Sequence, residues 1–458
     1  TFPVEDVSQV GPEDIFIIGG KMEVKQLGRR AELELMFNKF PHVPREPILQ
    51  IDLYREGTAL TDSALRVLEP FATKTYNLFI WDRIAADTRL SKIPDQIHIT
   101  GGIYGLRGNV NVDWHVNPES GYIVDIIDGK LTLCSRENDQ HIPIAPILDP
   151  YPRPKYKDKH FEDGTSYGEV VDVIPGKPFT RFVALRMCQF WGYEEECKFC
   201  DINRAAKEQQ RVGLRSKRGW FEKPEQVKEA FREAYFGEEW PPGRLPPGIL
   251  FTGGTILGKV DGLNEDDFYM RYADAIHEAI GYRWPLCLQT GPKTPEVAKR
   301  YRDAGVDVHE TNLEVWDERI FNILCPGKAK RFGWKNWVDM MCDEVDVFGL
   351  GNVSPCFVCG TEMAEPFGFK TIDEAVESTL KGWDYLMAHG VVPRPREWTV
   401  EAGSALAGQK SPPLEYLIRV FYGWYELWKK YSLPPMRRYD IMGPGREQAD
   451  RGWAAMGC

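Results

Sequence analysis

Hydrophobic and polar residues follow one pattern up to about residue 178 and a different one after it. In the first part, short segments alternate apolar and polar positions, as in NVNVDWHV (109–116) and GYIVDIIDGKLTLC (121–134). Asp128-Gly129 stands between two apolar runs of the second segment, as a hairpin turn requires. One amphipathic helix is expected over 61–72. The pattern predicts a small unit that mixes helix and strand.

After residue 178, apolar strand segments alternate with amphipathic helical segments. Such alternation is typical of parallel βαβ units, whose sheet is buried on both faces. Six units fit an open barrel, in which functional groups collect at the carboxyl ends of the strands. The expected strands are TRFVALRM (180–187), GILFT (248–252), PLCLQT (285–290), VDVHE (306–310), VSPCFVCG (353–360) and EWTVEAG (397–403).

These patterns divide the chain into three parts. The fold class is α/β: a partial (β/α)6 TIM-like barrel over 179–405, preceded by an N-terminal α+β domain over 1–178 of unassigned role. The Pro-rich, charged stretch 149–164 predicts a linker between them. Apolar residues at helical spacing within 412–435 predict a helix that packs on the barrel, in a C-terminal helical extension over 406–458.

Composition and charge narrow the classes of function. The 458 residues are 43% hydrophobic and 27% charged, which is typical of a folded protein, and no run reaches the roughly 18–20 apolar residues of a membrane span. The formal net charge of -11 disfavours nucleic acid and anionic membranes as partners. A local basic run is interpreted as a solvated surface; it holds Arg204, Arg211, Arg215, Lys217 and Arg218.

The expected compartment is the cytoplasm. The opening residues TFPVEDVSQVGPEDIF lack the basic and apolar regions of a signal peptide. Ten cysteines in 458 residues are too few for a disulfide scaffold, and clustered cysteines in a reducing compartment more often serve metal binding or catalysis.

Three of the cysteines form a cluster in the loop after the first expected barrel strand. Cys188, Cys197 and Cys200 have the spacing C-x8-C-x2-C. A structural zinc site normally takes four protein ligands in two close pairs, and only one close pair is present here. A [4Fe-4S] cluster held by three thiolates leaves one iron free to bind a substrate or cofactor. The spacing therefore favours such a cluster over the alternatives, a zinc site, a structural iron-sulfur site or buried thiols.

This loop, with the aromatic Phe199 just before its last cysteine, resembles the cluster-binding loop of the radical S-adenosylmethionine (radical SAM) superfamily. CKFC (197–200) matches the second half of that motif, while the first gap is eight residues here and usually three in the family. Motifs at later strand ends add to the resemblance, and the Asn-Leu-Glu element is similar to the biotin synthase-like branch. These motifs are Gly253-Gly254-Thr255, Asn312-Leu313-Glu314, and FVCGTE (357–362) with Gly360 and Glu362.

The resemblance implies an enzyme with a [4Fe-4S] cluster on Cys188, Cys197 and Cys200 and with S-adenosyl-L-methionine (SAM) at the free iron. An electron from a ferredoxin- or flavodoxin-type donor would cleave SAM to a 5′-deoxyadenosyl radical, which abstracts hydrogen from a small-molecule substrate. It also implies that Phe199 contacts the cofactor. The methionyl group of SAM would be contacted by Gly253, Gly254 and Thr255, its ribose by Asn312 and Glu314, and its adenine by Gly360 and Glu362.

Two alternatives stay open from the sequence. Within enzymes, the alternative is a radical SAM methylase or a macromolecule-modifying enzyme whose first domain presents the partner. Outside enzymes, it is a non-catalytic metal-binding barrel protein. Glu401, in the last expected strand, is expected either to bind substrate or SAM or to pair with Arg394 or Arg396.

The remaining cysteines are expected to have structural roles. Cys356 and Cys359 lie three apart on a strand, so they point to opposite faces and are expected to be buried thiols. Cys287 stands where biotin synthase carries a ligand of a second cluster, but Thr252 and Val353 cannot supply its companion thiolates. His309 is expected to be a hydrogen-bonded barrel residue. No chemistry is assigned to Cys325, Cys342 or Cys458.

Overall fold

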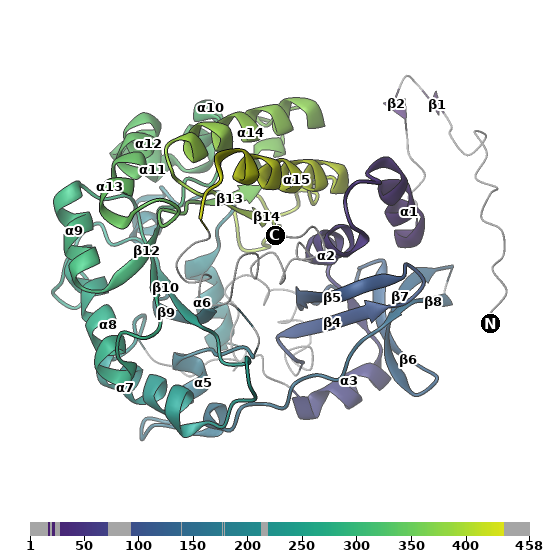
Figure 1. The fold of residues 1–458 in the computed structure, drawn as a ribbon, viewed down its shortest axis with the longest axis horizontal. Coiled ribbons are helices and arrows are strands. Elements are labelled where there is room, and N and C mark those ends of the chain that lie inside the picture. Colours follow the sequence, from purple (N-terminus) through teal and green to yellow (C-terminus); the bar gives the residue numbers. More distant parts are fainter. Residues whose placement is uncertain are drawn as a thin grey trace.

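The structure is a computed structural model of the 458-residue chain (Figure 1). It describes residues 17–18, 21–22, 28–71, 93–138, 140–175, 177, 179–211 and 219–434. Arg215, Lys217, Arg218, Cys458 and the outer ends of the two terminal parts therefore lie outside the described residues.

The N-terminal region is built from short helices and two small groups of strands. β3, β6, β7 and β8 form a four-stranded sheet, and β4 pairs with β5 in an antiparallel hairpin. The predicted hairpin at Asp128-Gly129 is confirmed: both residues have positive φ, 49° and 75°, as a tight two-residue turn needs. The elements are β1 (Ile17–Ile18), β2 (Lys21–Met22), α1 (Arg29–Lys39), α2 (Arg45–Glu56), β3 (Ala59–Leu60), α3 (Asp62–Leu68), β4 (Gln96–Gly101), β5 (Leu106–Asp113), β6 (Tyr122–Ile127), β7 (Lys130–Glu137) and β8 (Gln140–Pro146).

Helices α1 and α2 were not predicted from the sequence. α2 explains why, because its buried residues include polar as well as apolar side chains, among them Glu46, Gln50 and Asp52. A helix that buries polar residues has no simple apolar stripe, so periodicity does not reveal it.

The expected linker at 149–164 is instead packed into the structure. Tyr156 is buried and donates a hydrogen bond from its hydroxyl to the carbonyl oxygen of Val171 at 2.8 Å. Lys157 is also buried and forms an ion pair with Asp172 at 2.8 Å. The charged residues that suggested a solvated linker thus anchor this segment.

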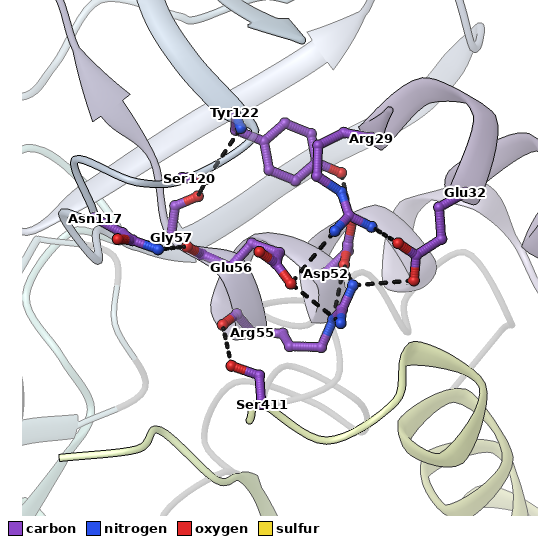
Figure 2. Close-up of polar contacts among 10 residues, drawn as sticks. All are labelled: Arg29, Glu32, Asp52, Arg55, Glu56, Gly57, Asn117, Ser120, Tyr122 and Ser411. Atoms are coloured by element: carbon purple, nitrogen blue, oxygen red, sulfur yellow. Dashed lines mark hydrogen bonds and ion pairs between the residues drawn. The ribbon is translucent and has the colours of Figure 1, made fainter. Parts of the chain in front are cut away.

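A buried charge cluster holds α1 and α2 together (Figure 2). Asp52 of α2 is fully buried, pairs with Arg55 at 2.7 Å and accepts a hydrogen bond from the Tyr122 hydroxyl at 2.6 Å. Arg29 lies 3.4 Å from the same carboxylate. Burial alone would raise the pKa of Asp52, but Arg55 and Arg29 together hold it below its ordinary value.

We expect Asp52→Asn to destabilise the fold by about 3 kcal/mol at pH 7, because Arg29 and Arg55 lose the fully buried carboxylate between them and keep only the partly exposed Glu32 and Glu56. Since the folded-state pKa is depressed, the contribution of this charge is complete above the unfolded pKa of about 3.9 and is lost as the pH falls through the folded value. Urea unfolding of both proteins between pH 7 and pH 3 should show the gap narrowing below about pH 4.

The matched control is Asp158→Asn, which breaks the ion pair of Asp158 with Arg153. The Asp158 side chain is 67% exposed. We expect a loss of less than about 1 kcal/mol for it. Equal losses in the two variants, or a gap that does not change with pH, would contradict the buried-charge account.

The second half of the chain forms an open barrel of parallel strands. β9 to β12 form one parallel sheet in the order β12-β11-β10-β9, and β13 pairs in parallel with β14. Parallel bridges His309–Val353 and Glu314–Phe357 join the two groups. Among the described residues, no pairing closes β14 onto β9. The strands are β9 (Phe179–Leu185), β10 (Gly248–Gly253), β11 (Leu286–Gln289), β12 (Val306–Glu310), β13 (Cys356–Cys359) and β14 (Arg394–Glu397).

Helices cover the outside of these strands. A capping box at Thr371 starts the long helix α14. The last helix, α15, packs on α14 and also on α2 of the N-terminal region. None of the described helices has both the length and the hydropathy of a membrane span. The helices are α5 (Tyr167–Val170), α6 (Ile202–Arg211), α7 (Pro224–Arg232), α8 (Glu265–Ile280), α9 (Pro295–Asp303), α10 (Glu318–Leu324), α11 (Pro326–Arg331), α12 (Trp334–Asp343), α13 (Val345–Phe348), α14 (Ile372–Ala388) and α15 (Leu414–Tyr431).

The last expected strand was placed too late in the sequence. The prediction of 397–403 followed the alternation of Trp398 and Val400, but the strand is Arg394–Glu397. Its four residues include three charged side chains and a proline, which is a pattern typical of a loop. These charged residues are accommodated because Arg394, Arg396 and Glu397 line an internal cavity.

The N-terminal region lies across the open side of the barrel, with α2 beside β14 (Figure 1). Asp113 of β5 forms an ion pair with Lys177, two residues before β9. Burial alone would raise the pKa of Asp113, but Lys177, Arg181 of β9 and Arg396 of β14 hold it well below its ordinary value. Since β9 and β14 are the two edges of the barrel, Asp113 stands between them.

Candidate active site

A cavity of about 390 Å³ runs through the interior of the barrel. Proteins bind small ligands in pockets of this size. The barrel strands, the loops at their carboxyl ends and the N-terminal region all contribute to its wall. From the sequence prediction, its lining includes Cys188, Cys197, Phe199, Cys200, Gly253, Gly254, Thr255, Asn312, Glu314 and Glu401.

The cysteine loop follows β9, as predicted, and backbone contacts at both ends hold it. The side chain of Asn203 forms two hydrogen bonds with the backbone of Cys188. It accepts one from the Cys188 N–H at 2.7 Å and donates the other to the Cys188 carbonyl oxygen at 3.2 Å. Near the other end, the Lys198 N–H donates to the Leu324 carbonyl at 2.8 Å. A buried Glu195 pairs with Arg331 at 2.8 Å. The eight-residue gap is thus an ordered turn.

The three thiols lie close enough to influence one another. Burial raises the pKa of Cys188 to about 11, although hydrogen bonds from Phe190 and Thr255 oppose the shift. Burial, followed by the charge on Cys197, raises the pKa of Cys200. A hydrogen bond from Cys325, with a contribution from the Lys328 charge, lowers the pKa of Cys197 against the effect of burial. Cys197 is therefore the thiol that ionises most readily.

Within the described residues, no group of three or more His, Cys, Asp or Glu side chains has the geometry to hold a single metal ion. One tetrahedral zinc ion brings its sulfur ligands to about 3.8 Å from each other, since each Zn–S bond is about 2.3 Å. An iron-sulfur cluster instead spreads its thiolates, because each one binds a different iron.

The Gly-Gly-Thr segment packs directly against the start of the cysteine loop. A Cβ added to Gly254 would overlap the carbonyl oxygen of Met187 and lie 2.6 Å from Cys188 Cα. Gly253 is similarly close to Leu185. The Gly254 carbonyl accepts a hydrogen bond from the Tyr269 hydroxyl at 2.8 Å. The glycines are thus needed first for close packing of β10 on the loop, and both also line the cavity.

We expect Gly254→Ala to destabilise the fold by about 1–3 kcal/mol, because the added methyl meets backbone atoms that cannot move aside as a flexible side chain would. Gly258→Ala is the control, since its Cβ would meet only the Gln189 side chain at 3.7 Å. Urea unfolding should separate the two variants. Equal midpoints for Gly254→Ala and the wild type would contradict the close packing.

Asn312 and Glu314 lie on the cavity wall beyond β12, and both already have protein partners. Glu314 forms an ion pair with Lys328 at 2.6 Å, and Lys328 also donates to the Asn312 carbonyl at 2.7 Å. The side-chain oxygen of Asn312 accepts from the Cys356 N–H at 3.1 Å, which fixes the start of β13. Lys328 lines the same cavity, so it accompanies the predicted pair.

Gly360 and Glu362, the expected adenine contacts, are not among the residues that line the cavity. Glu362 is buried, accepts hydrogen bonds from Tyr416 and, at 2.8 Å, from Thr379, and so ties the end of β13 to α14 and α15. Gly360 has a φ of 111° and lies against Pro412. The contacts of both residues stabilise the fold.

The other sequence expectations near the barrel have mixed outcomes. His309 is fully buried, and its ring nitrogens are hydrogen-bonded to Glu344 at 2.7 Å and Thr290 at 2.8 Å, so the prediction of a hydrogen-bonded barrel residue is confirmed.

Cys356 lines the cavity, whereas Cys359 does not. Arg394 pairs with buried Glu310. Glu401 is 2% exposed, so it is a buried carboxylate of the cavity wall.

Sequence analysis missed the cavity residues that come from outside the barrel motifs. Tyr54, Asp113 and His115 belong to the N-terminal region, and Lys177 lies between the two parts. None is within a motif, and no spacing along the chain connects them to the barrel.

Comparisons with known proteins give structural similarity only; no family model and no curated protein matches the chain. The radical SAM methyltransferase from Sphaerobacter thermophilus has a TM-score of 0.36 at 15% identity, over 70% of this chain and 77% of that one. The FeFe-hydrogenase maturase HydG from Carboxydothermus hydrogenoformans has 0.36 at 12%, over 55% and 51%. Coproporphyrinogen III oxidase (HemN) from Escherichia coli, a radical SAM enzyme, has 0.34 at 12%, over 60% and 57%.

Two of these three proteins are described as radical SAM enzymes. The match spans about half of the length of the maturase.

Proposed function

We propose that this protein is a radical SAM enzyme that acts on a small molecule. It would hold a [4Fe-4S] cluster on Cys188, Cys197 and Cys200 and bind SAM beside it. The main support is that these three thiols, from one loop, line the same internal cavity as the Gly253–Thr255 segment and the Asn312 and Glu314 pair.

The donor set fits a cluster with one iron left open to a ligand. Cys325 contacts Cys197 but is not part of the cavity wall. Cys356 lines the cavity, but the charges that act on it come from Arg394, Glu314, Arg396 and Glu310 rather than from the three loop thiols. Of the four cysteines that line the cavity, three thus come from one loop, and Cys356 lines it separately from β13. When bound, the cluster would supply the electron that cleaves SAM to a 5′-deoxyadenosyl radical.

The residues of this chain would position SAM and exclude water. Glu314, held by Lys328, would accept hydrogen bonds from ribose hydroxyls with its second oxygen, the role that its resemblance to the biotin synthase-like branch implies. Phe199, Phe190 and Trp337 give the same wall an apolar surface. A site of this kind keeps a reactive intermediate away from solvent until it meets the substrate.

A small-molecule substrate agrees with the way in which the cavity is closed. The N-terminal region covers the open side of the barrel, and its residues line the cavity beside β9 and β14. A volume of about 390 Å³ is within the range of pockets that bind small ligands. The electron would come from a low-potential donor of the ferredoxin or flavodoxin type.

Anaerobic reconstitution tests the proposal directly. We expect a brown protein with about four irons per chain, which releases 5′-deoxyadenosine when given SAM and dithionite. Cys200→Ala should lower this release at least a hundredfold, because it removes a cluster ligand. The matched control is Cys342→Ala, a cysteine of α12 outside the cavity wall, which should stay within twofold of the wild type.

A colourless protein that binds zinc would instead identify the non-catalytic metal-binding alternative, and full activity in Cys200→Ala would contradict the ligand assignment.

If the protein releases 5′-deoxyadenosine, deuterium transfer into it from deuterated metabolite pools would report the substrate. Deuterium that arrives only from a protein or nucleic acid fraction would favour the macromolecule-modifying alternative.

A further inference from the structure

Arg396 is a half-buried cation of the cavity wall that forms no ion pair with any residue that the structure describes. It comes from β14 and lines the cavity. Within the part of the chain that the structure describes, its guanidinium makes neither a hydrogen bond nor an ion pair, and its one close contact is the ring of Tyr54, 6.0 Å from Cζ to the centroid. At that distance the aromatic face attracts the cation only weakly.

Every other basic side chain on this part of the wall has a carboxylate partner. Lys177 pairs with Asp113, and Arg394 pairs with Glu310. Arg181 pairs with Asp172 at 3.1 Å. Each of these three cations thus has a carboxylate within ion-pair distance, whereas Arg396 has none among the described residues.

The surroundings keep Arg396 charged. Burial alone would lower its pKa, but Tyr54, Glu397 and Asp113 together hold it above its ordinary value. Neither carboxylate is within ion-pair distance of the guanidinium, and Asp113 is already engaged by Lys177. A cation that has lost part of its hydration and has no hydrogen-bonded partner is unfavourable, so such residues are usually paired or serve a ligand.

A second donor lies two residues along the chain. Trp398 also lines the cavity and is 3% exposed, and its indole N–H has no acceptor among the residues that the structure describes. A buried donor without an acceptor is unusual in a folded protein. Two neighbouring residues of one segment therefore offer unused donors to the same cavity, and both prefer an acceptor with negative charge.

We propose that the substrate carries an oxyanion, a carboxylate or a phosphate, that binds Arg396 where the N-terminal region meets the barrel. The planar guanidinium suits two parallel hydrogen bonds to such a group. That the bound anion is a substrate rests on the proposed function. The inference also assigns the N-terminal region a role in recognition, since its Tyr54 supplies the ring that faces the cation.

Binding of simple anions tests this site without any radical chemistry. The reconstituted protein, without dithionite, is titrated with inorganic phosphate and with succinate, and neutral succinamide is the matched non-ionic probe. Thermal unfolding at constant ionic strength gives the affinities, because a ligand that binds only the folded state stabilises it. We expect at least one of the two anions to bind, and succinamide to bind at least tenfold more weakly than succinate if succinate is that anion.

Arg396→Gln should weaken anion binding at least tenfold, and Arg396→Lys should recover part of the loss because it restores the charge without the planar fork. Arg283→Gln is the matched control: Arg283 also lies over an aromatic ring, Trp284 at 5.3 Å, but outside the cavity. It should bind anions as the wild type does. A preference for phosphate or for succinate would identify which oxyanion the substrate carries.

The proposal is overturned if the wild type binds neither anion, or if Arg396→Gln binds them as tightly as the wild type. Should Arg396→Gln fail to fold, two comparisons still decide the question. The first is the affinity of the wild type for succinate against its affinity for succinamide. The second is the affinity of Arg396→Lys for each anion against that of the wild type. None of these measurements requires SAM cleavage, so a protein that binds the anions but releases no 5′-deoxyadenosine would refute the proposed function alone.

Discussion

The close approach of the end of β10 to the first turn of the cysteine loop is the constraint on which the site depends. Gly254 lies so near Met187 and Cys188 that no side chain fits between them. Thr255 then hydrogen-bonds Cys188, and Asn203 holds the same residue from the start of α6. Because the position of Cys188 is fixed from both sides, the three thiols are held at the carboxyl ends of the strands, on one wall of the cavity.

The open side of the barrel creates a second requirement. Parallel strands that stop short of closure leave β9 and β14 with unpaired edges, which another part of the chain must cover. Here the N-terminal region covers them, and the ion pair of Asp113 with Lys177 lies at the junction. The same residues that close the barrel therefore also line the cavity, which joins a structural role to a role in recognition.

Buried charge shows how the two halves of the molecule differ. In the α1–α2 cluster, Arg29 and Arg55 pair with Glu32, Asp52 and Glu56, so every charge has a partner and the cluster serves stability (Figure 2). In the cavity wall, Lys177, Arg181 and Arg394 each pair with a carboxylate, whereas Arg396 forms no ion pair with a described residue. A cation without such a partner is unfavourable in an empty cavity and favourable in one that receives an anion.

The primary sequence was sufficient for features that depend on neighbouring residues. The βα alternation, the hairpin at Asp128-Gly129, the cap at Thr371 and the cysteine spacing all follow from local periodicity or local turn chemistry. Features that depend on the meeting of distant segments were beyond it. Arg394–Glu397 resembles a loop because its polar side chains face a cavity, and Glu362 resembles a cofactor ligand although it bonds to α14 and α15. Whether a polar residue serves a ligand or the fold is set by the partner that packing brings to it, and local sequence does not contain that partner.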